Sequence, residues 1–198
     1  MSKKHIIAIA ALSALVAGPV QAQDLKAGDL LVRARAVHLN SANKDSTGLD
    51  LSVNNKWLPE VDFTYFMSPN LAAELILTVP QKHTLSAGSA EIGSLKHLPP
   101  TLSLQYHFPA GPVKPYVGAG LNYTRFSSVN LPAGVDIKRN SVGASLQAGV
   151  DIPVGKDLYL NFDVKKVFIS TKVSAGGSEI GKFKVDPVLV GVGLGWKF

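Results

Sequence analysis

The sequence predicts an all-β fold, an eight-stranded antiparallel transmembrane β-barrel. Eight segments of about nine or ten residues alternate apolar and polar side chains, a pattern typical of strands whose two faces meet different surroundings. This is also the length of a tilted strand that crosses a bilayer. The connections between the segments alternate in length, and aromatic residues gather near the segment ends. A soluble β-sandwich is the structural alternative.

The first 22 residues predict a secretory signal peptide. Two lysines near the N-terminus precede an apolar run over residues 6–16, and the small-residue site Val-Gln-Ala ends at Ala22. An apolar run of this length is too short to span a bilayer as a helix. We therefore expect residues 1–22 to be removed and residues 23–198 to form the barrel.

The composition limits the kinds of partner that we expect for this protein. Removing the leader takes away two lysines and no acidic residue, so the formal net charge falls from +6 to +4. The basic residues are scattered, so we expect no nucleic-acid partner. The sequence has no cysteine and no His-Glu-x-x-His spacing, and we expect no metal or cofactor. After residue 22 no run of about twenty apolar residues occurs, so a membrane-spanning chain must cross with strands.

The eight segments each place apolar residues on one parity. They are residues 30–39, 57–66, 71–79, 101–108, 116–124, 141–151, 158–166 and a last segment that starts near Phe183 and ends at Phe198. The final strand is the strictest, because its second face is mostly glycine. We expect the apolar face to meet lipid and the glycines to face a lumen that is only wide enough for packed side chains.

The connections predict the orientation in the membrane. The short ones are residues 67–70, 109–114 and 152–157, and the long ones are 40–56, 80–100, 125–140 and 170–182. Short periplasmic turns and long extracellular loops are typical of outer-membrane barrels. We therefore expect the outer membrane of a Gram-negative bacterium, with lipid and lipopolysaccharide as neighbours.

The aromatic residues predict two girdles at the membrane interfaces. The periplasmic girdle would contain Tyr65, Phe66, Tyr106, Phe108, Tyr116, Tyr159, Trp196 and Phe198. The extracellular girdle would contain Trp57, Tyr123, Phe126, Phe168 and Phe183.

The inward parity of the strands carries charges of both signs. These predicted lumen residues are Arg33, Arg35, Glu60, Asp62, Glu74, Gln105, Asp163 and Lys165. Buried charges need partners, so we expect an ion-paired network that closes the lumen.

Several stretches resemble the OmpW family of small outer-membrane barrels, and more closely its AlkL-like members. They include GDLLVRARAVHL at 28–39, HLPPTL at 97–102, PYVGAGLNYT at 115–124 and VDPVLVGVGLGWKF at 185–198. The resemblance implies a narrow, partly hydrophobic channel that small apolar molecules enter from outside and leave sideways through the wall. Phe198 also resembles the C-terminal aromatic signal by which the barrel-assembly machinery recognises its substrates.

Apolar residues at the strand tops and in the loops predict an entrance pocket for such a solute. They are Leu39, Trp57, Leu58, Leu98, Pro99, Pro100 and Leu131. Burial of apolar area, at roughly 25 cal/mol per Å², would drive binding. These residues could equally pack the loops. Prolines 59, 99 and 100 cannot donate to a strand ladder, and they mark either a lateral opening or loop and edge positions.

We therefore expect a monomeric channel for passive uptake of small hydrophobic solutes, with a plugged structural or adhesive barrel as the alternative. An enzyme is not expected. Ser103 and His107 share the inward parity with Glu74 nearby, but four residues along a strand separate them by about 13 Å.

Overall fold

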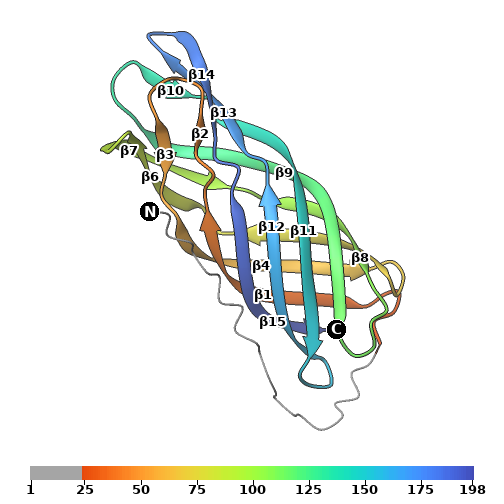
Figure 1. Cartoon of the computed structure of the whole chain (residues 1–198). Coiled ribbons are helices and arrows are strands. Elements are labelled where there is room, and N and C mark those ends of the chain that lie inside the picture. The colour runs from red at the N-terminus through yellow and green to blue at the C-terminus, as the bar shows by residue number, and fades with distance from the viewer. Residues whose placement is uncertain (1–23) are drawn as a thin grey trace, which may run out of the picture.

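The computed structural model describes residues 24–198, and the predicted signal peptide lies outside them. Eight antiparallel strands close into a barrel (Figure 1). In their order around the barrel they are β11 (Asn140–Pro153), β12 (Leu158–Val167), β15 (Val188–Lys197), β1 (Leu30–Asn40), β4 (Lys56–Phe66), β5 (Leu71–Thr78), β8 (Thr101–His107) and β9 (Lys114–Asn130). The predicted fold class is confirmed.

Two seams complete the closure. β9 pairs with β11 from Lys114–Asp151 to Arg125–Asn140, and β1 pairs with β15 along almost its whole length. The backbones of Leu30 and Phe198 exchange two hydrogen bonds, of 3.1 and 2.8 Å. The apolar last strand is therefore paired on both sides, which removes the exposed edge that would otherwise favour aggregation.

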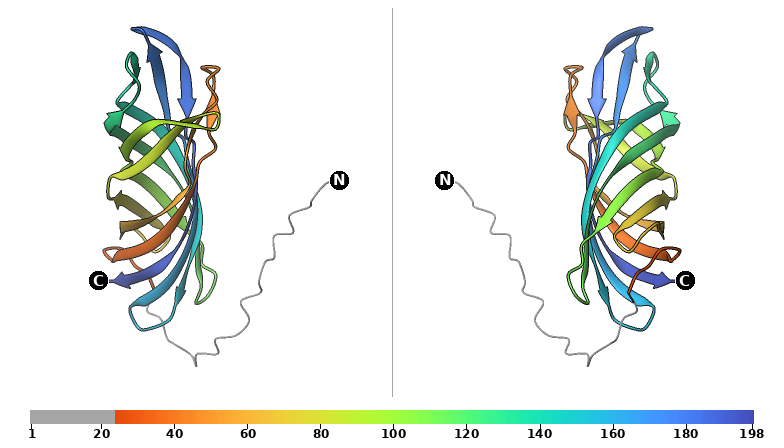
Figure 2. Two further views of the ribbon diagram at one scale, coloured as in Figure 1. Left: turned by 90° about the vertical axis from the view of Figure 1, so that its left-hand side faces the viewer. Right: turned by 90° about the vertical axis from the view of Figure 1, so that its right-hand side faces the viewer.

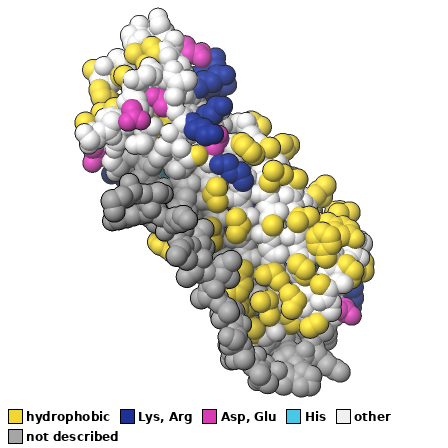
Figure 3. Space-filling view, viewed as in Figure 1, with side chains coloured by type: hydrophobic (Ala, Val, Ile, Leu, Met, Phe, Trp, Pro, Cys, Tyr) yellow, Lys and Arg dark blue, Asp and Glu magenta, His cyan; other side chains and the backbone are white. Residues whose placement is uncertain are grey.

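The barrel is apolar on the outside. On β8 every second residue is exposed, and Leu102 and Leu104 are 60% and 56% exposed. Figure 3 shows hydrophobic side chains spread over the barrel surface below the upper part of the molecule. This inverts the arrangement of a water-soluble barrel and suits contact with lipid. Residues 24–198 contain no helix that is long and apolar enough to cross a membrane.

The segments expected as long loops fold into a second β structure, the extension, above the barrel (Figure 2). Its strands are β2 (Lys44–Asp45), β3 (Leu51–Val53), β6 (Gln81–Ala87), β7 (Ala90–Leu98), β10 (Val135–Ile137), β13 (Ser170–Ala175) and β14 (Ser178–Lys184). β7, β6 and β3 continue the barrel sheet from the upper part of β9, and β10, β13, β14 and β2 form a separate sheet.

The last barrel strand begins at Val188, so its predicted start near Phe183 is wrong. Phe183 lies in β14 and is 2% exposed. Asp186 adopts φ +35° and Pro187 has no amide hydrogen, so the chain cannot continue one regular strand through both residues.

The extension packs on a buried apolar cluster that reaches down into the upper barrel. Its members are Val37, Leu39, Leu51, Val53, Leu58, Leu85, Leu95, Phe126, Ile137, Val167, Ile169, Val173, Phe183, Val185 and Leu189. The extension therefore has the apolar interior of a soluble β protein.

The girdle prediction is wrong for five aromatic residues, which point inward. Phe66, Tyr116 and Tyr159 are buried in the lower barrel, and Phe126 and Phe183 belong to the apolar cluster. The other eight are exposed on the outside. Parity, and not position along the strand, sets the direction of a side chain, as neighbouring Tyr65 and Phe66 show.

Candidate functional site

The lumen is filled by an ion-paired network built around two arginines of β1. Arg33 Nη1 lies 2.8 Å from Asp62 Oδ1, and its Nη2 and Nε lie 2.7 and 3.0 Å from the two oxygens of Asp151. Arg35 Nη2 lies 2.5 Å from Asp62 Oδ2 and 3.2 Å from Glu74 Oε1. The geometry joins both guanidinium groups to several carboxylates at once, which satisfies charges that burial would otherwise penalise.

Lys165 extends the network toward the upper end of the lumen. Its Nζ lies 2.6 Å from Glu60 Oε1 and 3.0 Å from Asp163 Oδ1. Arg35 Nε contacts the same Glu60 oxygen at 2.9 Å. The side chains of these residues are at most 4% exposed, so the network closes the barrel at this level.

The glycines of β15 make room for the arginines. A Cβ at Gly193 would lie 2.1 Å from the backbone oxygen of Ala34 and 2.7 Å from Arg35 Cγ. A Cβ at Gly195 would lie 3.1 Å from Arg33 Cγ. The bare face of the last strand therefore accommodates the two long side chains opposite it.

The structure brings seven of the eight predicted lumen residues into this network. Gln105, the eighth, is buried, but its Oε1 accepts a hydrogen bond from His107 Nε2 at 3.0 Å instead. Sequence reasoning missed Asp151, and it assigned Tyr116 to the girdle although its hydroxyl donates to Asp163 Oδ2 at 2.8 Å. Asp151 has the inward parity of its strand, and that signal could have identified it.

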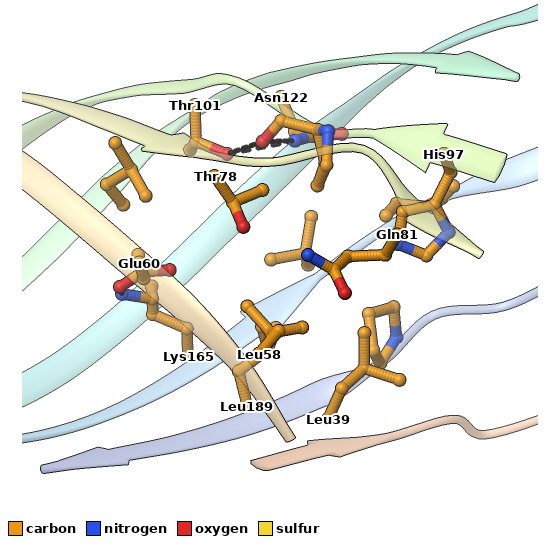
Figure 4. A pocket seen from close by; sticks show the side chains of 15 residues that line it. Leu39, Leu58, Glu60, Thr78, Gln81, His97, Thr101, Asn122, Lys165 and Leu189 are labelled. Atoms are coloured by element: carbon orange, nitrogen blue, oxygen red, sulfur yellow. Dashed lines mark hydrogen bonds and ion pairs between the residues drawn. The ribbon is translucent and has the colours of Figure 1, made fainter. Parts of the chain in front are cut away.

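An apolar pocket lies directly above the network (Figure 4). Glu60 and Lys165 form its floor, and leucine, isoleucine, valine and proline side chains form most of its wall. The lining residues are Leu39, Leu58, Glu60, Ile76, Thr78, Gln81, His97, Pro99, Thr101, Asn122, Lys165, Val167, Ile169, Pro187 and Leu189. Its volume is about 30 Å³, so the pocket is narrow.

Three of the seven predicted pocket residues, Leu39, Leu58 and Pro99, line this pocket. Trp57 does not. It is 62% exposed on the outer face with its ring 5.0 Å from that of His38, because it has the parity opposite to Leu58. Leu98 is half-buried in β7, opposite Arg125 of β9.

The remaining two predicted pocket residues line other hollows. Leu131 lines a second pocket of about 40 Å³ in the extension, whose lining includes Leu95, Phe126 and Phe183. Pro100 lines an open groove on the outer wall of the barrel, together with exposed residues such as Leu102 and Leu121.

His97 separates the two internal pockets. It lines the lower pocket, its ring stacks on His83 at 4.5 Å, and its ring centroid lies 6.4 Å from Phe126, which lines the upper pocket. Neither ring nitrogen of His97 has a hydrogen-bond partner among the described residues. Burial, and then the charges of His83 and Lys56, lower the pKa of His97 to about 3, so its imidazole is neutral at pH 7.

The barrel wall is thin beside the pocket. Thr101 and Asn122 line both the lower pocket and the outer groove. Asn122 Nδ2 donates to the carbonyl oxygens of Pro99 and Pro100 at 3.1 and 3.2 Å, and to Thr101 Oγ1 at 2.9 Å. Pro99 and Pro100 have no amide hydrogen to donate to a strand ladder. The hydrogen bonds from the Asn122 side chain therefore help to hold this part of the wall together.

The residues considered for catalysis form no triad in the described chain. Ser103 Oγ has no hydrogen-bond partner there, and His107 Nε2 bonds Gln105. Among the described residues no group of three or more histidine, cysteine or acidic residues could hold a metal ion.

Comparison with known proteins places this barrel in a family. The sequence model of the OmpW family matches residues 26–198. The chain belongs to the OmpW family. It is an outer-membrane barrel of the Gram-negative type, so the extension lies on the extracellular side.

Several known proteins are similar to this chain in sequence. The chain is 43% identical to an uncharacterized outer-membrane protein, y4mB, of Sinorhizobium fredii over 76% of this chain and 70% of that protein. It is 32% identical to outer membrane protein W of Vibrio cholerae over 99% of this chain and all of that protein. It is 29% identical to the dibenzothiophene metabolism operon protein PahQ of Pseudomonas aeruginosa over 82% and 80% of the two chains.

Among solved structures, OprG of Pseudomonas aeruginosa superposes with a TM-score of 0.76 at 26% identity, over 89% of this chain and 99% of that chain. The outer-membrane protein AlkL, solved in lipid bilayers, superposes with a TM-score of 0.69 at 23% identity, over 92% and 95%. The AlkL comparison shows a shared fold.

Proposed function

We propose that this protein is a passive, non-enzymatic channel that takes small hydrophobic molecules from the extracellular side and releases them sideways into the membrane. One observation carries the proposal. The apolar lower pocket has a closed, charged floor, while its wall at Thr101 and Asn122 is shared with an apolar groove on the lipid-facing side. A hydrophobic solute would lose free energy in the charged lumen and gain it by moving toward lipid.

The extension supports the same route. The upper pocket is lined almost wholly by apolar side chains, and the apolar cluster joins it to the lower pocket. The name of the relative PahQ, a dibenzothiophene metabolism operon protein, associates that protein with an apolar aromatic compound. Because both pockets are narrow, passage of a solute requires the side chains between them, including His97, to move.

The test compares two neighbouring residues on opposite faces of β4. Leu58→Gln places an amide in the lower pocket, and Trp57→Gln makes a similar change on the outer surface. Purified protein is placed in vesicles whose outer leaflet contains lipopolysaccharide, because octane crosses a plain phospholipid bilayer without a channel, and entry of octane and of glucose is assayed. We expect faster octane entry than in empty vesicles, no effect on glucose, a several-fold loss with Leu58→Gln and little change with Trp57→Gln.

The alternative is a plugged structural barrel without transport, which the ion-paired lumen favours. Octane entry equal to that of empty vesicles would support the plugged barrel and contradict the channel. Octane and glucose entering at the same accelerated rate would instead indicate a water-filled pore and contradict sideways release.

A further inference from the structure

A row of lysines crosses the outer face of the separate extension sheet. Lys138 follows β10, Lys172 lies on β13, Lys182 and Lys184 lie on β14, and Lys44 lies on β2. All five are exposed, while residues that alternate with them, such as Val173 and Phe183, are buried. Figure 3 shows Lys and Arg side chains in a stripe just above the apolar surface of the barrel.

The strand register places these like charges opposite one another. Lys172 pairs with Lys182 across β13 and β14, and Lys184 pairs with Lys44 across β14 and β2. The backbone amide of Lys138 donates to the carbonyl of Lys172 at 2.9 Å, which brings a third lysine to the same level. Like charges directly opposite on neighbouring strands destabilise a sheet, so a bound anion would stabilise this arrangement.

The carboxylates nearby do not balance the row. Glu179 contacts Lys172 at 2.6 Å, and Asp136 pairs with Arg139 at 2.8 Å, which adds no net charge. Lys138, Lys172 and Lys182 line one open groove of about 180 Å³ with Asn140 and Ser141, and no acidic residue is among its lining. The groove therefore offers ammonium, amide and hydroxyl groups, which are suitable partners for phosphate oxygens.

The groove begins at the edge of the apolar surface. Val142, which is 72% exposed, also lines it, and Phe168, 41% exposed, lies two residues before Ser170 of the same groove. A ligand bound here would meet lysines above and apolar side chains below. This combination fits a phosphorylated lipid in the outer leaflet better than a soluble anion.

We propose that the lysine row and its groove bind the phosphate groups of the lipid A portion of lipopolysaccharide. The acyl chains would then lie along Val142 and the other exposed apolar residues below. The bound phosphates would relieve the repulsion between Lys172 and Lys182 and anchor the extension at the membrane surface.

The test measures binding of three probes to the mature protein in phosphatidylcholine nanodiscs. The probes are bisphosphorylated lipid A, lipid A with both phosphates removed, and inorganic phosphate. The variant Lys172→Gln/Lys182→Gln is compared with Lys26→Gln/Lys156→Gln, which makes the same change of charge at exposed lysines near the opposite end of the barrel. Binding and thermal unfolding are followed with and without each probe.

We expect the bisphosphorylated lipid to bind and to raise the unfolding temperature. The Lys172→Gln/Lys182→Gln variant should bind it roughly 25-fold more weakly, at about fivefold for each lysine near a membrane surface. In nanodiscs without lipid A, this variant should unfold at the same temperature as the wild type or at a higher one, since it has lost the repulsion between Lys172 and Lys182. A purely structural role for the lysines would lower that temperature.

Three results would overturn the proposal. Equal binding of the dephosphorylated lipid would show that acyl contacts suffice. Equal competition by inorganic phosphate would assign the groove to a free anion. An equal loss in the Lys26→Gln/Lys156→Gln variant would indicate a general effect of net charge.

Discussion

The barrel and the extension place polar and apolar residues in opposite ways. In the barrel, the buried interior holds Arg33, Arg35 and their carboxylates, while Leu102 and Leu121 are exposed. In the extension, Phe183 and Val173 are buried and lysines lie outside. The same period-two alternation serves both halves, and only the solvent on the outer face differs.

The difference shows how the chain adapts to two solvents without a domain boundary. β9 runs from the lower barrel into the extension as one strand of 17 residues. Along its outer parity, Leu121 and Tyr123 are followed by Arg125. The surface changes from apolar to charged within a few residues, and this change marks the upper limit of the lipid contact.

The largest expected effect on stability comes from disrupting the ion-paired network in the barrel interior. Arg33→Ala would remove the arginine that pairs with Asp151 and one of the two arginines that pair with Asp62, all in a buried site. We expect a loss of about 3–5 kcal/mol in the free energy of unfolding. Urea unfolding in lipid vesicles, followed by tryptophan fluorescence, measures it.

Arg139→Ala is the matched control, because its pair with Asp136 is 47% and 62% exposed in the extension. That loss should stay below about 1 kcal/mol. Similar losses for both arginines would contradict the distinction between the charged interior of the barrel and the charged outer face of the extension.

The fold followed from the sequence because alternation, strand length and loop length all depend on local chain order. Seven of the eight strand segments, residues 30–39 to 158–166, lie within two residues of the observed bounds at nearly every end, although β9 extends well beyond Thr124. The lumen charges were identifiable because parity fixes which face a residue occupies.

The pocket was less predictable, because it depends on how the long connections fold. Trp57 and Leu58 are equally apolar neighbours, and only the register of β4 separates the outer surface from the pocket. His97 and Gln81 reach the pocket through β7 and β6, strands that the sequence analysis treated as loop. β6 and β7 pair as a local hairpin across Gly88 and Ser89, which the sequence could have indicated, whereas the pairing of this hairpin with β3 and β9 has no signature in a local pattern.

A lysine on the lipid-facing surface tests where the two halves meet. Leu121→Lys places a charge on the outer face of β9, where the wild-type leucine is 67% exposed. We expect about 2–4 kcal/mol of destabilisation if the residue lies near the bilayer midplane, and less toward the interface.

Ser178→Lys is its control, since Ser178 is exposed in the extension and pairs with Ala175 across the strands, so the charge should be tolerated there. Unfolding in vesicles compares the two variants. An equal and small effect at both positions would place Leu121 outside the hydrocarbon layer.

The smallest of the three effects is a pH dependence in the extension. Burial lowers the pKa of His97 to about 3, well below the value of about 6.5 expected for an unfolded chain. The unfolded form therefore takes up a proton first as the pH falls. The contribution of His97 to the free energy of unfolding is fully present above pH 6.5. It decreases between pH 6.5 and about 3, and the loss at pH 5 is roughly 2 kcal/mol. Amide hydrogen exchange of β6 and β7, corrected for intrinsic rates, should show faster opening at pH 5, and most of this change should disappear in His97→Leu.

His38→Leu is the control and should keep the wild-type dependence, because His38 lies on the outer face beside Trp57. Faster opening at pH 5 that persists in His97→Leu would assign the effect to other groups, with His83 first, since burial also lowers its pKa.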